Sequence, residues 1–345
     1  MTPILITFGL ALIGGTTAYW LNVPLAWLIG PLITIGMARI AGMNLKTPSG
    51  GLQIGQSTVG VAVGLQMTSP VVFFLYQEIG LILTAGSVTV LLGWPMAVLL
   101  QRLAQEDIKT CYFAAVPGGL SEMAVLGSRY GAQVEPIAIA QTMRLAMIVV
   151  VVPPVMALSG ITGDSLMASS GADFLSWLNT ALLIAVAVAV SAVLSRFKVS
   201  NAWLLGGVLT GCSIAVASKM VLGMHALVIH AAQFFLGIGL GVMFNRNFVT
   251  RAPRFIRSAA VIMVVMLGLA WAGAALVSHY TEHDFGTMML SFAPAGVTEM
   301  VLTAKALGFE APLITAIHLT RILFIVMFAV LLFRLTIEEK APPSQ

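Results

Sequence analysis

The sequence is poor in charged residues. Asp, Glu, Lys and Arg make up 9% of its 345 residues, whereas 59% are hydrophobic and the mean hydropathy is +1.00. A soluble domain carries about a quarter of its residues as charged side chains. Because this chain has too few to cover a water-facing surface, the composition predicts an all-α polytopic membrane protein embedded in the lipid bilayer.

Motifs that the sequence lacks exclude several classes of protein. There is no basic stripe with interleaved aromatic residues, so nucleic acid is not expected as a partner. A nucleotide fingerprint, a phosphate-binding loop and a nucleophile elbow are also missing. Cys111 and Cys212 form no ligand pair. His279 and His283 have helical spacing, but no third ligand accompanies them. We therefore expect no metal, no cofactor and no enzyme activity.

Apolar runs of spanning length occur ten times in the sequence. They cover 3–20, 24–42, 51–68, 71–101 and 135–158, and then 176–194, 201–219, 224–244, 256–279 and 312–334. The first run has no basic segment before it and no cleavage motif after it, so it is interpreted as a span and not as a signal peptide. A short Pro/Gly segment separates the fourth and fifth runs of each set. These segments read PGGLSEMAVLGSRYG from 117 and PAGVTEMVLTAKALG from 294.

The two sets of runs align at a nearly constant offset. Residues 177 positions apart match as Glu122/Glu299, Arg144/Arg321, Gln56/Gln233, Gly60/Gly237 and Gly64/Gly241, and AWL recurs at an offset of 176. This pattern indicates an internal duplication, which is common in transporter folds. It predicts a first repeat over 1–158, an external linker over 159–175, a second repeat over 176–337 and a cytoplasmic tail over 338–345.

The basic residues predict that the two repeats are inverted. The connection at 68–70 has no Lys or Arg, whereas its counterpart up to Arg257 has four arginines. Since cytoplasmic loops collect basic residues, this favours five crossings per repeat with both termini in the cytoplasm. Lys219 does not fit this scheme. Counting each Pro/Gly segment as a span would give twelve helices and parallel repeats. The four arginines up to Arg257 would then lie outside the cytoplasm, so ten spans are preferred. Whether the Pro/Gly segment is a re-entrant hairpin or a broken helix stays open.

The Pro/Gly segments are the candidate site. Proline cannot continue a helix, and glycine allows backbone shapes that other residues avoid. Non-helical backbone at membrane depth is tolerated where protein covers it or it lines a cavity, and paired breaks point to a transporter's binding site. Ser121 is expected to cap a half-helix that begins at Glu122. The candidates here are Pro117, Gly118, Gly119 and Ser121, with Pro294, Gly296 and Thr298 in the second copy. The structural alternative is a pair of proline kinks.

Four charged residues accompany the breaks. Glu122 and Glu299 would carry a proton or contact a cation, or else serve as loop residues or halves of ion pairs. Arg144 and Arg321 fall near mid-membrane, where an arginine must face a partner or water. They would either pair with the glutamates or bind a transported carboxylate. Further candidates that could line the path are Gln56, Gln233 and His318.

These residues resemble a known family. PGGLSEM, PAGVTEM, the repeated AWL elements and the arginine after each motif look like the AbrB-duplication membrane proteins. The resemblance covers nearly the whole chain. That family has been called an ammonia monooxygenase, a regulator of gene expression and a transporter family. At the level of the fold, it implies a similarity to sodium/proton antiporters and bile-acid symporters.

The sequence as a whole favours a secondary transporter in the inner membrane of a bacterium. It would move a small solute, with anions among the candidates, by alternating access between the repeats, with proton or sodium coupling. The alternatives are a membrane-embedded metal-dependent oxidase and a membrane protein that regulates gene expression without transport. The substrate, the coupling ion, the direction of transport and a homo-oligomeric state are left open.

Overall fold

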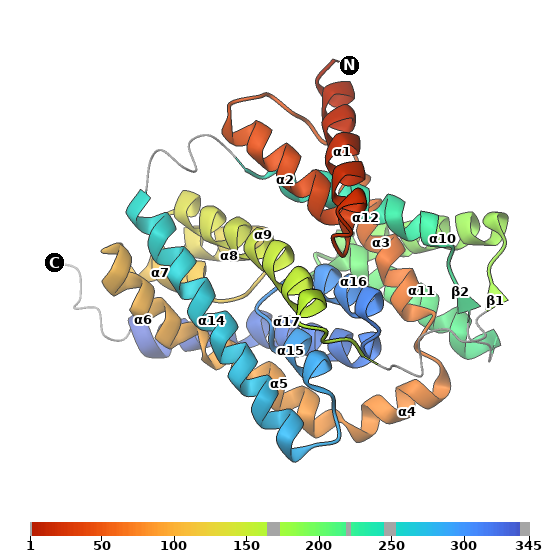
Figure 1. Cartoon of the computed structure of the whole chain (residues 1–345). Helices are drawn as coiled ribbons and strands as arrows, with labels where there is room; N and C mark the ends of the chain where they lie inside the picture. The colour runs from red at the N-terminus through yellow and green to blue at the C-terminus, as the bar shows by residue number, and fades with distance from the viewer. Residues whose placement is uncertain (1, 164–172, 219–221, 245–252, 339–345) are drawn as a thin grey trace. The chain divides into compact units, whose positions relative to one another are not determined.

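The computed structural model describes residues 2–163, 173–218, 222–244 and 253–338, and these are helical throughout apart from two short strands and the connections between elements (Figure 1). The strands β1 (Asp173–Phe174) and β2 (Leu222–Gly223) pair in parallel, with Asp173 opposite Leu222. The prediction of an all-α membrane protein is confirmed. Most of the predicted linker and of the predicted tail lies outside the described residues, as does residue 219.

The chain forms two compact units, and each contains elements of both halves of the sequence. Unit 1 holds α1 (Thr2–Trp20), α2 (Ala26–Ile40), α3 (Gly51–Gly64), α4 (Ser69–Gln77), α10 (Trp177–Arg196), α11 (Ala202–Ser218), α12 (Ala226–Val242) and α16 (Val297–Leu307). Unit 2 holds α5 (Ile79–Leu91), α6 (Gly93–Ala104), α7 (Ile108–Ala115), α8 (Leu120–Arg129), α14 (Pro253–Tyr280), α15 (Phe285–Phe292) and the π-helical turn η1 (Arg334–Glu338). The long helices α9 (Val134–Leu158) and α17 (Ala311–Phe333) contribute to both units.

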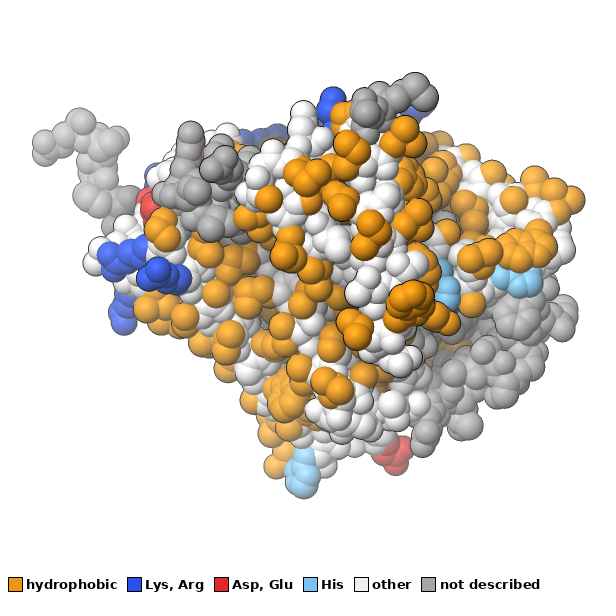
Figure 2. All heavy atoms as spheres, turned by 45° about the horizontal axis from the view of Figure 1, so that its top comes forward, with side chains coloured by type: hydrophobic (Ala, Val, Ile, Leu, Met, Phe, Trp, Pro, Cys, Tyr) orange, Lys and Arg blue, Asp and Glu red, His pale blue; other side chains and the backbone are white. Residues whose placement is uncertain are grey.

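Every predicted apolar run contains a helix. Among the described residues, six helices are long and apolar enough to cross a membrane, and a seventh crossing results if α3 and α4 count as one bent span. Three further apolar helices, α2, α11 and α12, have 15 to 17 residues. On the face drawn in Figure 2, hydrophobic side chains predominate and charged ones are few. This surface fits a lipid environment.

One predicted span boundary is wrong. The sequence predicts a single span over 71–101 after a loop at 68–70. Instead Ser69 begins α4, which is bent by 88° from α3, and the span runs from Ile79 to Ala104. Thr68 is extended and Pro70 lies in the first turn of α4, a position where proline favours the start of a new helix.

The two halves of the sequence repeat in three dimensions. Helices α7 and α15 begin and end at equivalent positions of the two repeats, and α9 and α17 begin at equivalent positions. In the connections α1–α2 and α10–α11, left-handed backbone recurs at an offset of 176. Asn22 and Lys198 have φ of 52° and 56°, and Leu25 and Asn201 have φ of 54° and 51°. Because non-glycine residues rarely adopt this conformation, its recurrence supports a true structural duplication.

Equivalent helices run in opposite directions within each unit. In unit 1, Gly51 lies against Phe235 and Leu52 against Gly239, whereas Gly55 lies against Ala232, so α3 and α12 are antiparallel. Gly55 and Ala232 are themselves equivalent, so a pseudo-twofold axis passes between them.

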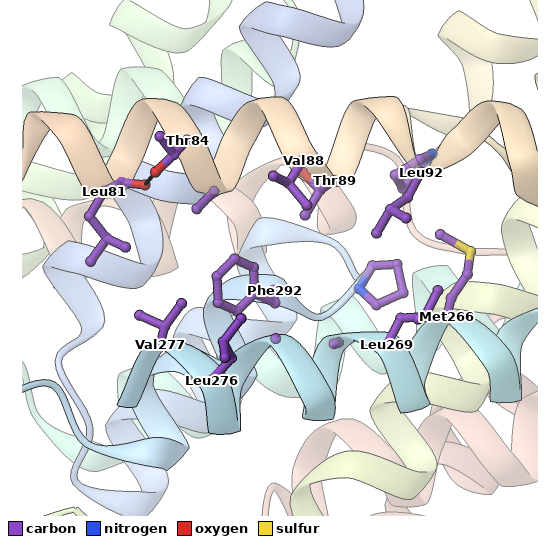
Figure 3. Close-up of a pocket in the computed structure, with 15 residues that line it drawn as sticks. Leu81, Thr84, Val88, Thr89, Leu92, Met266, Leu269, Leu276, Val277 and Phe292 are labelled. Carbon is purple, nitrogen blue, oxygen red and sulfur yellow. Dashed lines mark hydrogen bonds between the residues drawn. The ribbon is translucent and has the colours of Figure 1, made fainter. Parts of the chain in front are cut away.

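In unit 2, Arg254 at the start of α14 donates a hydrogen bond from Nε to the carbonyl of Leu103 at the end of α6 (2.9 Å), so α14 is antiparallel to the equivalent span α5–α6. Figure 3 shows the same opposite direction for α5 and α14. Antiparallel equivalent spans are the arrangement that inverted repeats produce, and they do not fit twelve parallel helices.

Glycines bring helices of unit 1 into close contact at equivalent positions of the two repeats. A Cβ added at Gly60 of α3 would lie 2.3 Å from the carbonyl oxygen of Leu204 in α11, and one added at Gly237 of α12 would lie 2.4 Å from that of Leu28 in α2. Leu28 and Leu204 are equivalent residues. These glycines therefore allow close packing of neighbouring helices.

Candidate functional site

Each Pro/Gly segment joins two short helices. The first, Val116–Gly119, connects α7 to α8, and the second, residues 293–296, connects α15 to α16. The residues that end α7 and α15 have nearly the same backbone, with φ of −62° and ψ of 126° at Val116 and φ of −55° and ψ of 130° at Ala293. Helices of 8 to 11 residues are too short to span a bilayer, so each segment forms a broken helical element.

The short helices α7 and α15 start with the same cap. The carboxylate of Asp107 accepts a hydrogen bond from the backbone N–H of Thr110 at 3.1 Å. Asp284 accepts one from the N–H of Thr287 at 2.8 Å. An aspartate cap satisfies an N–H group that has no partner within the helix, and it thereby fixes where each helix begins.

The two buried arginines hold the breaks. Arg144 donates from Nη1 to the carbonyl of Val116 (3.3 Å) and from Nη2 to that of Gly118 (2.9 Å). Arg321 donates from Nη1 to the carbonyl of Ala293 (2.8 Å) and from Nη2 to that of Ala295. Both side chains are only 2% exposed. A cation at the carbonyl end of α7 or α15 is favoured by the helix dipole and satisfies carbonyls that the helix leaves unbonded.

One turn before each arginine, a second side chain reinforces this contact. Gln141 donates from Nε2 to the carbonyls of Phe113 and Val116, both at 2.9 Å. The equivalent residue is His318, whose Nε2 lies 2.9 Å from the carbonyl oxygen of Leu290. His318 is therefore a packing partner of the second break. Gln141 was not among the predicted site residues, although its position in QTMR, aligned with HLTR around Arg321, was a usable signal.

The expected caps of the half-helices are wrong by two residues. Helix α8 begins at Leu120 with Gly119 as its cap, and α16 begins at Val297, directly after Gly296. Ser121 and Thr298 are therefore the second residues of these helices. The side chain of Ser121 lies outside the described atoms, and Thr298 is buried. Glycine can cap a helix without a side chain, because the extended backbone before the helix is sufficient.

The two glutamates occupy the third position of each half-helix. The Glu122 carboxylate folds back over Gly119, since a Cβ added there would lie 3.0 Å from Glu122 Oε2. Glu122 is half-buried in unit 2, whereas Glu299 is 6% exposed in unit 1. A carboxylate in the first turn is stabilised by the helix dipole.

The weaker candidates Gln56 and Gln233 lie on α3 and α12. Gln56 is half-buried on α3 and Gln233 is buried on α12, both in unit 1. The structure thus brings Pro117, Gly118 and Arg144 together, and it groups Pro294 with Arg321 and His318 in the same way.

A cavity of about 250 Å³ in unit 2 links the two breaks (Figure 3). Helices α5 and α14 supply most of its wall, and Pro117 and Pro294 both line it. In Figure 3, Leu92, directly after α5, faces the equivalent Leu269 of α14. The cavity is therefore lined by equivalent residues of the two repeats. The sequence did not predict this cavity.

Within the described ranges, no group of three His, Cys, Asp or Glu side chains is placed to hold a metal ion. His225 instead stacks on Trp177, with ring centroids 4.3 Å apart. His318 contacts a backbone carbonyl.

The fold and the site define a class: a polytopic helical membrane protein of inverted repeats, in which each repeat carries a broken helix held by a buried arginine. The chain belongs to the family described as "Transition state regulatory protein AbrB", which matches residues 27–337.

Two bacterial proteins are similar over most of their length. "Uncharacterized protein YhjN" of Bacillus subtilis (strain 168) is 25% identical over 93% of this chain and 90% of its own. "Putative regulator AbrB" of Escherichia coli (strain K12) is 22% identical over 89% of this chain and 88% of its own. No solved structure matches the chain. These comparisons bear out the resemblance noted from the sequence.

Proposed function

We propose that this protein is a secondary transporter of a small solute in the bacterial inner membrane, working by alternating access between its two repeats. The observation that carries the proposal is the pair of arginine-held helix breaks in antiparallel repeats. In transporters with inverted repeats, substrate and coupling ions bind at discontinuous helices, because broken ends expose backbone N–H and C=O groups at membrane depth.

Each break offers both kinds of backbone group. The carbonyls that follow α7 and α15 suit a cation and already accept hydrogen bonds from the arginines, whereas the first N–H groups of α8 and α16 suit an anionic group of the solute. Ser121 and Thr298, in the first turn of these half-helices, add hydroxyl groups. Glu122 and Glu299 are assigned the coupling role, as carriers of a proton or as contacts to a sodium ion.

The arginines are assigned a positioning role. Both Nη atoms of each guanidinium donate to break carbonyls, so a solute carboxylate would have to compete with the backbone for them. Each arginine keeps its break in one shape and supplies positive charge beside it. This contribution favours an anionic solute without requiring direct contact.

A thermal-shift screen of the purified protein tests the proposal. Candidate metabolites are added with and without Na⁺ and at two pH values. A solute that binds the folded protein raises its melting temperature by mass action, and a coupled solute does so more strongly in the presence of its ion. Absence of a shift with every metabolite in a broad panel would count against a transporter.

Regulation without transport is the second candidate function. It is favoured by the description of the family and by the name of the Escherichia coli relative. A deletion strain separates the two functions. Transport predicts altered uptake or efflux of at least one metabolite, whereas regulation alone predicts altered transcripts with unchanged fluxes. The oxidase alternative predicts one stoichiometric copper or iron in the purified protein.

A further inference from the structure

The cavity in unit 2 is apolar although it reaches the two breaks. Its wall contains two polar side chains, Thr84 and Thr89, and both hydroxyls donate to carbonyls of their own helix, to Gly80 at 2.8 Å and to Gly86 at 2.9 Å. Since these donors are engaged, a ligand meets methyl, methylene and ring surfaces. Such a wall selects an apolar group and penalises a polar one, which would lose its hydrogen bonds to water.

The buried part of the cavity includes the prolines of both breaks. Pro117 and Pro294 are buried, as are Ala85 and Ala270, whereas the rim is exposed and includes Val88, Leu269 and Leu276 at 50%, 39% and 61%. A ligand that enters past the rim therefore arrives with its leading group against both prolines. Each proline directly precedes the backbone groups that the proposed function assigns to solute binding.

The volume sets the size of the group. An engineered apolar cavity of about 150 Å³ binds benzene. A cavity of about 250 Å³ is large enough for a fused bicyclic ring or a branched aliphatic group of similar bulk. We propose that this cavity holds a compact apolar group of the transported solute, so that the substrate is an amphipathic molecule of this kind. That the solute is transported rests on the proposed function, whereas the binding site itself rests on the cavity alone.

Gly273 is the position at which a larger side chain would fill this cavity. It lines the cavity from α14, and a Cβ added there would meet only Phe292, at 3.8 Å. A leucine at this position would project into open space without displacing the backbone, and leucine is a better helix former than glycine. Gly268 on the same helix is the matched control, because it is exposed, does not line the cavity and has nothing within 4 Å of an added Cβ.

The test uses the full chain in detergent and in phosphatidylcholine nanodiscs, with a fluorinated indole as the probe and fluorine NMR as the readout. We expect saturable binding to the wild type and to Gly268→Leu in both media, and binding weaker by about tenfold or more in Gly273→Leu. The affinity of Gly273→Ala, which adds only a methyl group, should lie between those of the wild type and Gly273→Leu. Melting temperatures confirm that each variant is folded.

Three outcomes would overturn the inference. These are equal binding by all variants, no saturable binding, or binding in detergent that phospholipid abolishes, which would assign the cavity to an acyl chain. The readout is independent of transport. Indole binding without flux of any solute would count against the transporter proposal and leave the site, whereas flux without indole binding would remove the site alone.

Discussion

Arg144 and Arg321 occupy equivalent positions of the two repeats, and they donate hydrogen bonds to carbonyls that are equivalent as well: Val116 and Ala293 from Nη1, and Gly118 and Ala295 from Nη2. The duplication has thus kept a complete bonding pattern and not only a pair of residues. Contacts kept in both copies indicate that the shape of each break matters to the molecule.

Removing an arginine should destabilise the protein. Arg144→Met removes the charged donor of the Gly118 carbonyl, at a cost of about 1.5–3 kcal/mol, whereas the Val116 carbonyl still accepts a hydrogen bond from Gln141. Thermal unfolding of the purified protein measures the effect. Arg129→Met is the matched control, since Arg129 is exposed on α8 and should change the free energy of unfolding by no more than about 0.5 kcal/mol. Equal melting of both variants would show that the break does not need its arginine.

The glutamates should matter for transport and not for folding. Glu122→Gln keeps the shape of the side chain in the first turn of α8 but cannot carry a proton or a negative charge. We expect normal melting and loss of coupled movement in Glu122→Gln, in Glu299→Gln or in both, because inverted repeats often specialise their two halves. Wild-type flux in both single variants would remove the carboxylates from the mechanism.

A double variant separates coupling from mere charge balance. If Glu122 only balanced Arg144, then Glu122→Gln combined with Arg144→Met would restore both stability and transport, because removing both members of a buried pair can be nearly neutral. We expect instead that the double variant still transports nothing. Recovery of flux in reconstituted vesicles would support the structural pair.

Close helix packing in unit 1 should not tolerate a methyl group. A Cβ added at Gly207 of α11 would lie 2.2 Å from the carbonyl oxygen of Ser57, so Gly207→Ala must push α3 and α11 apart. We expect a loss of about 1–3 kcal/mol. Gly9→Ala on α1 has nothing within 4 Å of the new Cβ and should be neutral or slightly stabilising. Thermal melting of the two variants gives the comparison.

The orientation in the membrane is tested by cysteine labelling. In a background without Cys111 and Cys212, single cysteines replace Ser69 and Arg257, both of which are exposed. The predicted topology places residues 68–70 outside and Arg257 inside, so an impermeant thiol reagent should label them from opposite sides. Labelling of both from the same side would contradict inverted repeats with cytoplasmic termini.

The sequence predicted much of this fold, because its two main signals are strong. Spanning length is recorded in uninterrupted apolar runs, and the duplication is recorded in matched pairs such as Glu122 and Glu299. The basic loops alone predicted the antiparallel relation that Arg254 and Leu103 display. Residues 246 and 251, which contributed to that argument, lie outside the described residues.

Other features could not be read from the sequence. The sequence indicates a connection at 68–70, but the 88° bend between α3 and α4 depends on the backbone conformation there, including the extended Thr68. The role of Gln141 depends on where the carbonyls of α7 lie in space. The cavity is bounded by α5 and α14, which are distant in the chain, and its lining residues look like ordinary lipid-facing positions.

The central claim, that this protein moves a solute, is tested most directly in proteoliposomes. Vesicles containing the wild type or the Glu122→Gln/Glu299→Gln variant receive a mixture of small metabolites under an imposed proton or sodium gradient, and mass spectrometry identifies what has entered. The account predicts that at least one solute accumulates with the wild type and not with the variant. A wild-type profile identical to that of protein-free vesicles under both gradients would contradict it.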